Sequence, residues 1–83
     1  MTQPIEVTIA CYSWFQFQLT AEYDKDTRLW RLDHDLNQWM RKTFKGRWGV
    51  IGGSYRVPLF IEDRNDAMMF KLIWLDKLWK GKD

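Results

Sequence analysis

The sequence predicts a small α+β domain, in which an antiparallel sheet of three to five strands has two helices packed on one face. Three observations lead to this prediction. Apolar and polar residues alternate near the N-terminus, as is typical of a strand. Two later segments carry apolar residues at helical spacing behind acidic residues that can cap a helix. Between them, two apolar runs flank Gly52 and Gly53, as in a β-hairpin.

The size and composition of the chain are those of one globular domain covering residues 1–83. Aromatic residues make up 17% of the chain, which is more than we expect so small a core to bury. The surplus indicates a binding face. A net charge of +2 is weak for a protein that binds nucleic acid mainly through its phosphates.

The N-terminus has no signal-peptide pattern, and no apolar run is long enough for a spanning helix. Cys11 is the single cysteine, so an internal disulfide or a cysteine-based metal site cannot form. We therefore expect a soluble cytoplasmic protein with no membrane contact, no cofactor and no metal.

The alternation runs in phase from Ile5 to Leu19. It predicts one long or bent strand, or two strands joined near Tyr12 and Ser13, with the odd positions toward the core. A turn is expected at residues 24–26, and residues 27–32 would form a short strand returning beside the first.

The first helix is predicted at residues 34–44. Asp33 is its expected N-cap, and Gly46 would close it in a left-handed conformation. The hairpin that follows pairs residues 47–51 with 54–61, and Pro58 places the second strand at an edge or at a bulge. With a two-residue turn, one face carries Trp48, Val50, Tyr55, Val57, Leu59 and Ile61, and the other carries Arg47, Gly49, Ile51, Arg56, Pro58 and Phe60.

The last apolar segment, residues 66–74, allows two interpretations. Capped by Asn65 or Asp63, it is a helix that is apolar nearly all round, with one side made of Ala67, Phe70, Trp74 and Leu78. If residues 71–75 form a strand instead, the order becomes β-α-β-β-α-β, which is ferredoxin-like. In the helical interpretation, the face with Met69, Ile73 or Trp79 is where a partner or a second copy would bind.

Catalytic and metal-binding patterns are weak. His34 has no nucleophile that any motif pairs with it, and Cys11 lies on the apolar face of the predicted strand. A calcium loop starting at Asp33 fails, because Gln38 and Phe44 stand where glycine and glutamate are needed. We predict that the protein is not an enzyme.

The face of the sheet away from the core is the candidate binding face. It combines aromatic and basic side chains, a mixture that stacks single-stranded bases or anchors protein partners. Residues 45–50 resemble the Lys-Gly-aromatic signature of RNA-recognition motifs, although Arg47 and Gly52 stand at two of its aromatic positions. The other interpretation is that the N-terminal segment or a loop covers this face. With the tail residue Trp79, the candidate contacts are Tyr12, Trp14, Arg47, Arg56, Phe60 and Trp79.

Residues 60–74 also resemble small accessory proteins of tailed bacteriophages, through Asn65, Asp66, Ala67 and the run Phe70-Lys71-Leu72 with Trp74. The resemblance implies a phage-encoded protein that inhibits or modulates a host protein or defence complex in the host cytoplasm. It assigns no functional residue. A single-stranded nucleic-acid-binding module is the alternative function, and a homodimer through an unpaired edge or through the surplus aromatic residues stays open.

Overall fold

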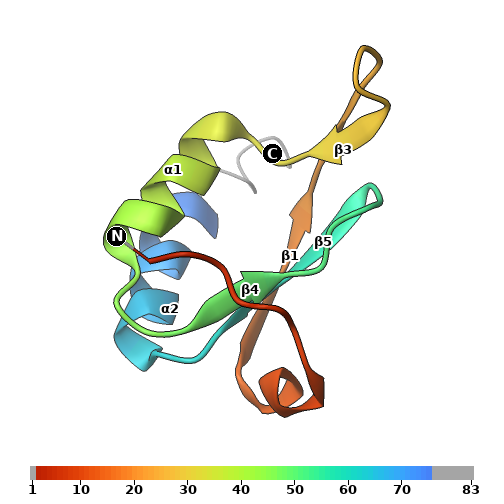
Figure 1. The fold of residues 1–83 in the computed structure, drawn as a ribbon. Coiled ribbons are helices and arrows are strands. Elements are labelled where there is room, and N and C mark those ends of the chain that lie inside the picture. Colours follow the sequence, from red (N-terminus) through yellow and green to blue (C-terminus); the bar gives the residue numbers. More distant parts are fainter. Residues whose placement is uncertain (1, 76–83) are drawn as a thin grey trace.

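The computed structural model describes residues 2–75. It is an α+β fold in which two helices cover one face of an antiparallel sheet (Figure 1). In chain order the elements are the 3-10 helix η1 (Ile9–Ser13), β1 (Phe15–Thr20), β2 (Glu22–Asp24), β3 (Leu29–Arg31), α1 (His34–Thr43), β4 (Trp48–Val50), β5 (Arg56–Ile61), α2 (Arg64–Phe70) and the π-helical turn η2 (Lys71–Leu75).

The sheet has the strand order β1-β5-β4, and both pairs are antiparallel. β2 and β3 form a separate two-stranded sheet that continues from the end of β1 and projects from the body (Figure 1). The predicted fold class is confirmed.

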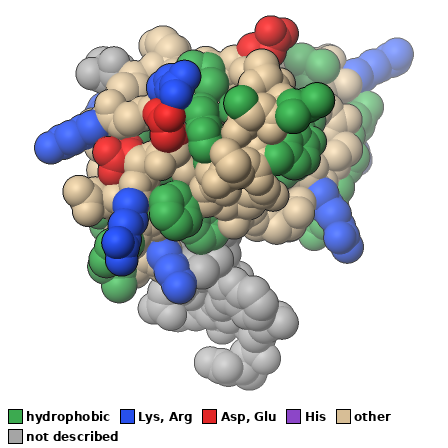
Figure 2. Space-filling view, turned by 90° about the horizontal axis from the view of Figure 1, so that it is seen from below, with side chains coloured by type: hydrophobic (Ala, Val, Ile, Leu, Met, Phe, Trp, Pro, Cys, Tyr) green, Lys and Arg blue, Asp and Glu red, His purple; other side chains and the backbone are tan. Residues whose placement is uncertain are grey.

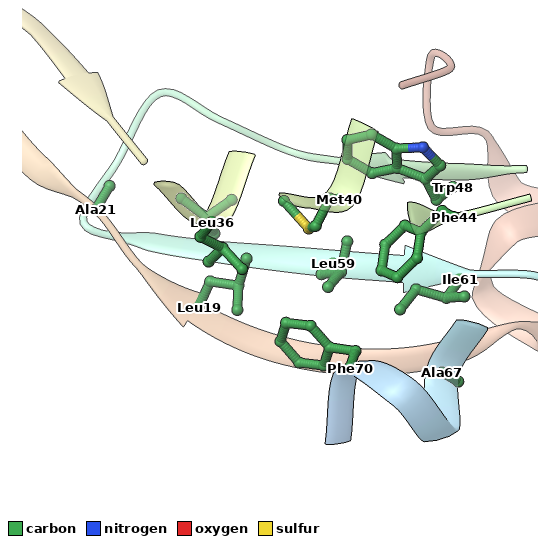
Figure 3. Close-up of a cluster of buried hydrophobic side chains, with 11 residues drawn as sticks. Leu19, Ala21, Leu36, Met40, Phe44, Trp48, Leu59, Ile61, Ala67 and Phe70 are labelled. Atoms are coloured by element: carbon green, nitrogen blue, oxygen red, sulfur yellow. The ribbon is translucent and has the colours of Figure 1, made fainter. Parts of the chain in front are cut away.

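The core lies between the three-stranded sheet and the two helices (Figure 3). The ring of Phe44 packs edge-on against Trp48 with centroids 5.5 Å apart, and Phe70 meets Phe17 at 4.9 Å. Aromatic contacts of this geometry add to the free energy gained by burying the rings. The other buried members include Leu19, Leu36, Met40, Leu59, Ile61 and Ala67.

The N-terminal segment departs from the predicted long strand. Residues 9–13 form η1, and Ile9 is 89% exposed although its position predicted a core side chain. Local hydrogen bonds favour the turn over the strand, since the Ser13 hydroxyl donates to the Ala10 carbonyl at 3.0 Å. Before η1 the chain runs beside β4, where the Ile5 amide donates to the Trp48 carbonyl at 2.8 Å.

A turn forms close to its predicted place, but over residues 25–28 rather than 24–26, and the returning strand β3 pairs with β2 and not with β1. The Asp24 carboxylate accepts a hydrogen bond from the Asp26 amide at 2.9 Å. Arg28 completes the reversal with a φ of 58°. Because this turn has only four residues, β3 returns directly beside β2 and pairs with it instead of with β1.

The first helix matches its prediction at the start, where the Asp33 side chain accepts from the Leu36 amide. The end differs, because Phe44 is extended (φ −68°, ψ 134°) and so the helix ends before Gly46. Glycine at position 46 serves close packing instead. A Cβ there would lie 2.7 Å from the Cβ of Asp63.

The β4–β5 connection is longer than the predicted two-residue turn. Ile51 lies opposite Pro58, and its amide donates to the Pro58 carbonyl at 3.2 Å. Relative to the predicted register the pairing shifts by four residues, an even number, so the side chains of β4 and β5 keep their predicted faces. Tyr55 does not, because it lies in the loop before β5. The prediction that Pro58 marks an edge is wrong, because β5 is central. Pro58 has no N–H to donate. It is tolerated in this central strand because it lies opposite the residue just after Val50, where β4 and its ladder of hydrogen bonds end.

The helical interpretation of residues 66–74 is confirmed, with Asp63 as the N-cap that accepts from the Asn65 and Asp66 amides. The strand alternative is wrong, and the ferredoxin-like order does not form. Asp66 is buried, and its carboxylate accepts from the backbone amides of Lys45 and Gly46 at 2.9 Å each. This side chain therefore ties the start of α2 to the segment that joins α1 to β4.

Candidate functional site

The N-terminal segment covers part of the predicted binding face of the sheet. A Cβ on Gly49 would lie 2.7 Å from the Ile5 carbonyl oxygen, so the two backbones touch. Further along, the Tyr12 ring lies on Phe60 with centroids 5.1 Å apart. Phe60 is 1% exposed, which leaves it as a support for Tyr12 rather than a contact residue. Phe60 therefore fits the other interpretation of the sequence, in which the N-terminal segment covers this face of the sheet.

Arg47 lies 5.2 Å from the centroid of the Trp14 ring, a cation–π contact. Its guanidinium also pairs with Glu62 through two hydrogen bonds, one of them 2.9 Å from Nε to Oε1. The hydrogen bond from Arg47 lowers the pKa of Glu62 below its usual value, and the same bond raises the pKa of Arg47. The Arg47 guanidinium is thus paired with a carboxylate of the protein itself.

The remaining predicted contacts do not join this cluster. Arg56 starts β5 opposite Thr20, at the other end of the strand from Phe60. Trp79 lies outside the described residues. Seen from the η1 side, exposed hydrophobic side chains are scattered among polar ones, with lysines and arginines at the margins (Figure 2). The exposed apolar residues around η1 include Ile9, Tyr12 and Phe15.

A second aromatic group forms where the β2–β3 hairpin meets the loop between β4 and β5. The Tyr23 and Trp30 rings are 5.2 Å apart at an interplanar angle of 62°. Trp30 in turn meets Tyr55 at 6.1 Å and 70°. The three side chains are 49%, 38% and 56% exposed, and we call Tyr23, Trp30 and Tyr55 the aromatic surface.

Backbone pairing holds this surface in place. Tyr23 and Trp30 are directly opposite in the β2–β3 register, so their side chains lie on one face of the hairpin. The Ala21 amide donates to the Tyr55 carbonyl at 2.8 Å, which fixes the loop against the chain leaving β1. Leu29 and Ile51, from the same two segments, are also exposed.

A cleft of about 470 Å³ opens beside the aromatic surface, and Leu29 and Trp30 form part of its wall. Its polar wall includes His34 and Arg41 from α1, and the Arg41 Nε donates to Asn37 at 3.2 Å. Arg31 also lines it and pairs with Asp24 at 3.3 Å.

The Asp24 carboxylate also accepts hydrogen bonds from its own turn. Its pKa is lowered chiefly by the Asp26 amide, with a smaller contribution from the Arg31 charge. Among residues 2–75, no group of three or more His, Cys, Asp or Glu side chains is placed to hold a metal ion.

Sequence reasoning missed the aromatic surface. The signal was available in part, because Tyr23 and Trp30 flank the predicted turn at residues 24–26, one on each side. Tyr55 comes from a loop more than twenty residues away, and no local pattern links it to the hairpin.

Comparison of the chain with protein-family models, with curated proteins and with solved structures finds no match. Within the described part of the chain, no helix has the length and apolar character needed to cross a membrane.

Proposed function

We propose that the protein is a non-enzymatic binding protein that inhibits or modulates a partner protein through the aromatic surface. The observation that carries the proposal is the exposed contact of Tyr23, Trp30 and Tyr55 beside a cleft. Tyrosine and tryptophan dominate the binding energy of protein interfaces, and they do so where the partner can exclude water from them. Rings already in mutual contact lose little conformational entropy on binding.

A protein partner suits these rings better than single-stranded nucleic acid. Bases stack on aromatic faces that are free and accompanied by uncompensated positive charge. Here the rings meet edge to face, and the neighbouring Arg31 is paired with Asp24. On the sheet face proposed for nucleic acid, Phe60 is buried and Arg47 is paired with Glu62.

The partner we propose is a bacterial host protein or defence complex, met in the host cytoplasm. This part of the proposal is supported by the resemblance of residues 60–74 to accessory proteins of tailed phages.

The test is recovery of a partner by affinity-tagged protein expressed in bacterial cells. Wild-type protein and Tyr12→Ala should each recover one stoichiometric partner, and Trp30→Ala should lose it. Failure of the wild-type protein to recover any partner would overturn the proposal. So would quenching of its tryptophan fluorescence by short single-stranded oligonucleotides that weakens steeply with added salt, since that behaviour belongs to a nucleic-acid binder.

A further inference from the structure

Within the part of the chain that the structure describes, β1 is an edge strand, with β5 as its one neighbour in the sheet. Pro58 directs its carbonyl toward β4, where it accepts from the Ile51 amide. Both backbone polar groups of a residue in an antiparallel strand point to the same side, so Pro58 does not bond to Gln18 opposite it. The N–H and C=O of Gln18 therefore point away from the sheet. By alternation, the same holds for Gln16 and Thr20.

Within residues 2–75 these outward groups have no backbone partner. All three residues are exposed. Such an edge is a template for pairing with another extended chain.

A groove of about 410 Å³ lies beside this edge, between β1 and α2. Phe15 and Phe17 line it from the strand, and Ala67 and Met68 line it from the helix. Phe15 is 45% exposed and Met68 is 51% exposed, so apolar area at the groove is open to solvent. A strand added to β1 would direct alternate side chains into this groove.

The charged residues of the groove have one sign. Arg64 and Lys71 line it, and none of the described residues that line it carries a carboxylate. Neither forms an ion pair with another described residue. The acidic residues nearby are engaged elsewhere, because Asp63 caps α2 and Asp66 binds the amides of Lys45 and Gly46.

We propose that this groove binds an extended acidic peptide segment of a partner protein, which adds to β1 as a fourth strand. The backbone of the peptide pairs with the outward groups of Gln16, Gln18 and Thr20. An apolar side chain of the peptide enters the groove between Phe15 and Met68. Acidic side chains on either side of it meet Arg64 and Lys71.

The spacing of the two basic residues defines the sequence that fits. Seven helical residues separate Arg64 and Lys71 by about 10 Å along the axis. Side chains on one face of a strand recur about every 7 Å, so residues four apart are about 13 Å apart. The arginine and lysine side chains are long and flexible enough to span the difference of about 3 Å between these two spacings. The matching pattern is acidic-x-apolar-x-acidic.

This site shares no residue with the aromatic surface or its cleft. It is therefore a second binding site, and its test does not depend on the proposed function.

The probe is the peptide acetyl-Thr-Glu-Thr-Val-Thr-Glu-Thr-amide with a fluorescent label, titrated with the 83-residue protein at low salt. Its control has lysine in place of both glutamates. A third peptide is N-methylated at the backbone amides that would face β1. We expect the acidic peptide to bind at least about tenfold more tightly than the basic control, because two ion pairs change to repulsion. N-methylation should cost a similar factor.

Two variants locate the site. The double variant Arg64→Gln with Lys71→Gln changes only exposed side chains and should weaken binding of the acidic peptide about tenfold. Gln18→Pro removes one outward N–H without breaking a β1–β5 hydrogen bond and should weaken it as well. Equal binding of acidic and basic peptides, or binding unchanged by N-methylation and by the double variant, would overturn the proposal. A dimer in sizing experiments that competes with the peptide would also overturn it, in favour of a second copy at this edge.

Discussion

The ring of Trp30 packs edge-on against that of Tyr55, with 6.1 Å between their centroids. This contact joins the small β2–β3 sheet to the loop between β4 and β5, which belongs to the main sheet. The contact between Trp30 and Tyr55 therefore links the projecting hairpin to the rest of the molecule, and it places three rings side by side at the surface.

Replacing Trp30 by alanine should abolish most partner binding. We expect the Kd to rise at least about 30-fold, as for an aromatic residue at the centre of an interface. The free energy of unfolding should fall by only about 1 kcal/mol, since the side chain is 38% exposed and mainly loses a cross-strand pair. Titration of the recovered partner and urea denaturation measure the two effects separately.

Tyr12→Ala is the matched control, because Tyr12 is as exposed as Tyr55 but lies on Phe60 at the covered sheet face. It should leave the Kd within about twofold. A larger loss in Tyr12→Ala than in Trp30→Ala would move the binding site to the sheet face.

Asp66→Ala should destabilise the protein more than most substitutions of a single polar residue. It leaves the backbone amides of Lys45 and Gly46 without their acceptor, and we expect a loss of about 2–4 kcal/mol in the free energy of unfolding. The urea midpoint should fall with an unchanged m-value. Asp35→Ala, an exposed acidic residue in the first turn of α1, should cost no more than about 1 kcal/mol. Equal effects of the two variants would contradict this role for Asp66.

Gly49→Ala should loosen the N-terminal segment. Its new Cβ would lie 2.7 Å from the Ile5 carbonyl oxygen, a contact that only a backbone shift can relieve. We expect faster hydrogen exchange at the Ile5 amide and a loss of about 1–3 kcal/mol in the free energy of unfolding. In Gly52→Ala the new Cβ has no atom within 4 Å, so exchange at Ile5 should stay unchanged.

The Arg47–Glu62 pair should give stability that depends on pH. The pKa of Glu62 lies below its usual value of 4.5 because Arg47 donates to its carboxylate. A lowered folded-state pKa stabilises the protein above the unfolded-state value, and this contribution disappears as the pH falls through the folded-state value. Urea midpoints of the wild-type protein should therefore exceed those of Glu62→Gln at pH 7. The difference should shrink below pH 4.5 and close at lower pH. A difference that is constant from pH 7 to pH 2.5 would show that the charge contributes nothing.

The predictable parts of this fold are those with local causes. Asp33 and Asp63 cap the helices because their side chains reach amides two or three residues along the chain. The faces of β4 and β5 were predicted correctly despite the wrong turn length, since a shift of four residues preserves alternation. The alternation from Ile5 to Leu19 misled because it continues through η1, where side chains such as Ser13 bond locally and end the strand.

The candidate site was less predictable, for a physical reason. Which side of the sheet stays open depends on where residues 2–14 pack, and that depends on the approach of Ile5 to Gly49. The contact between Trp30 and Tyr55 likewise depends on tertiary structure alone.

The most direct test of the account is photo-crosslinking in bacterial cells, with p-benzoylphenylalanine at position 23 or, as the control, at position 12. Both replacements keep an aromatic ring at an exposed site. We expect one crosslinked protein from position 23 and none from position 12. Crosslinking from position 12 alone, or to nucleic acid from either position, would contradict the claim that the aromatic surface binds a partner protein.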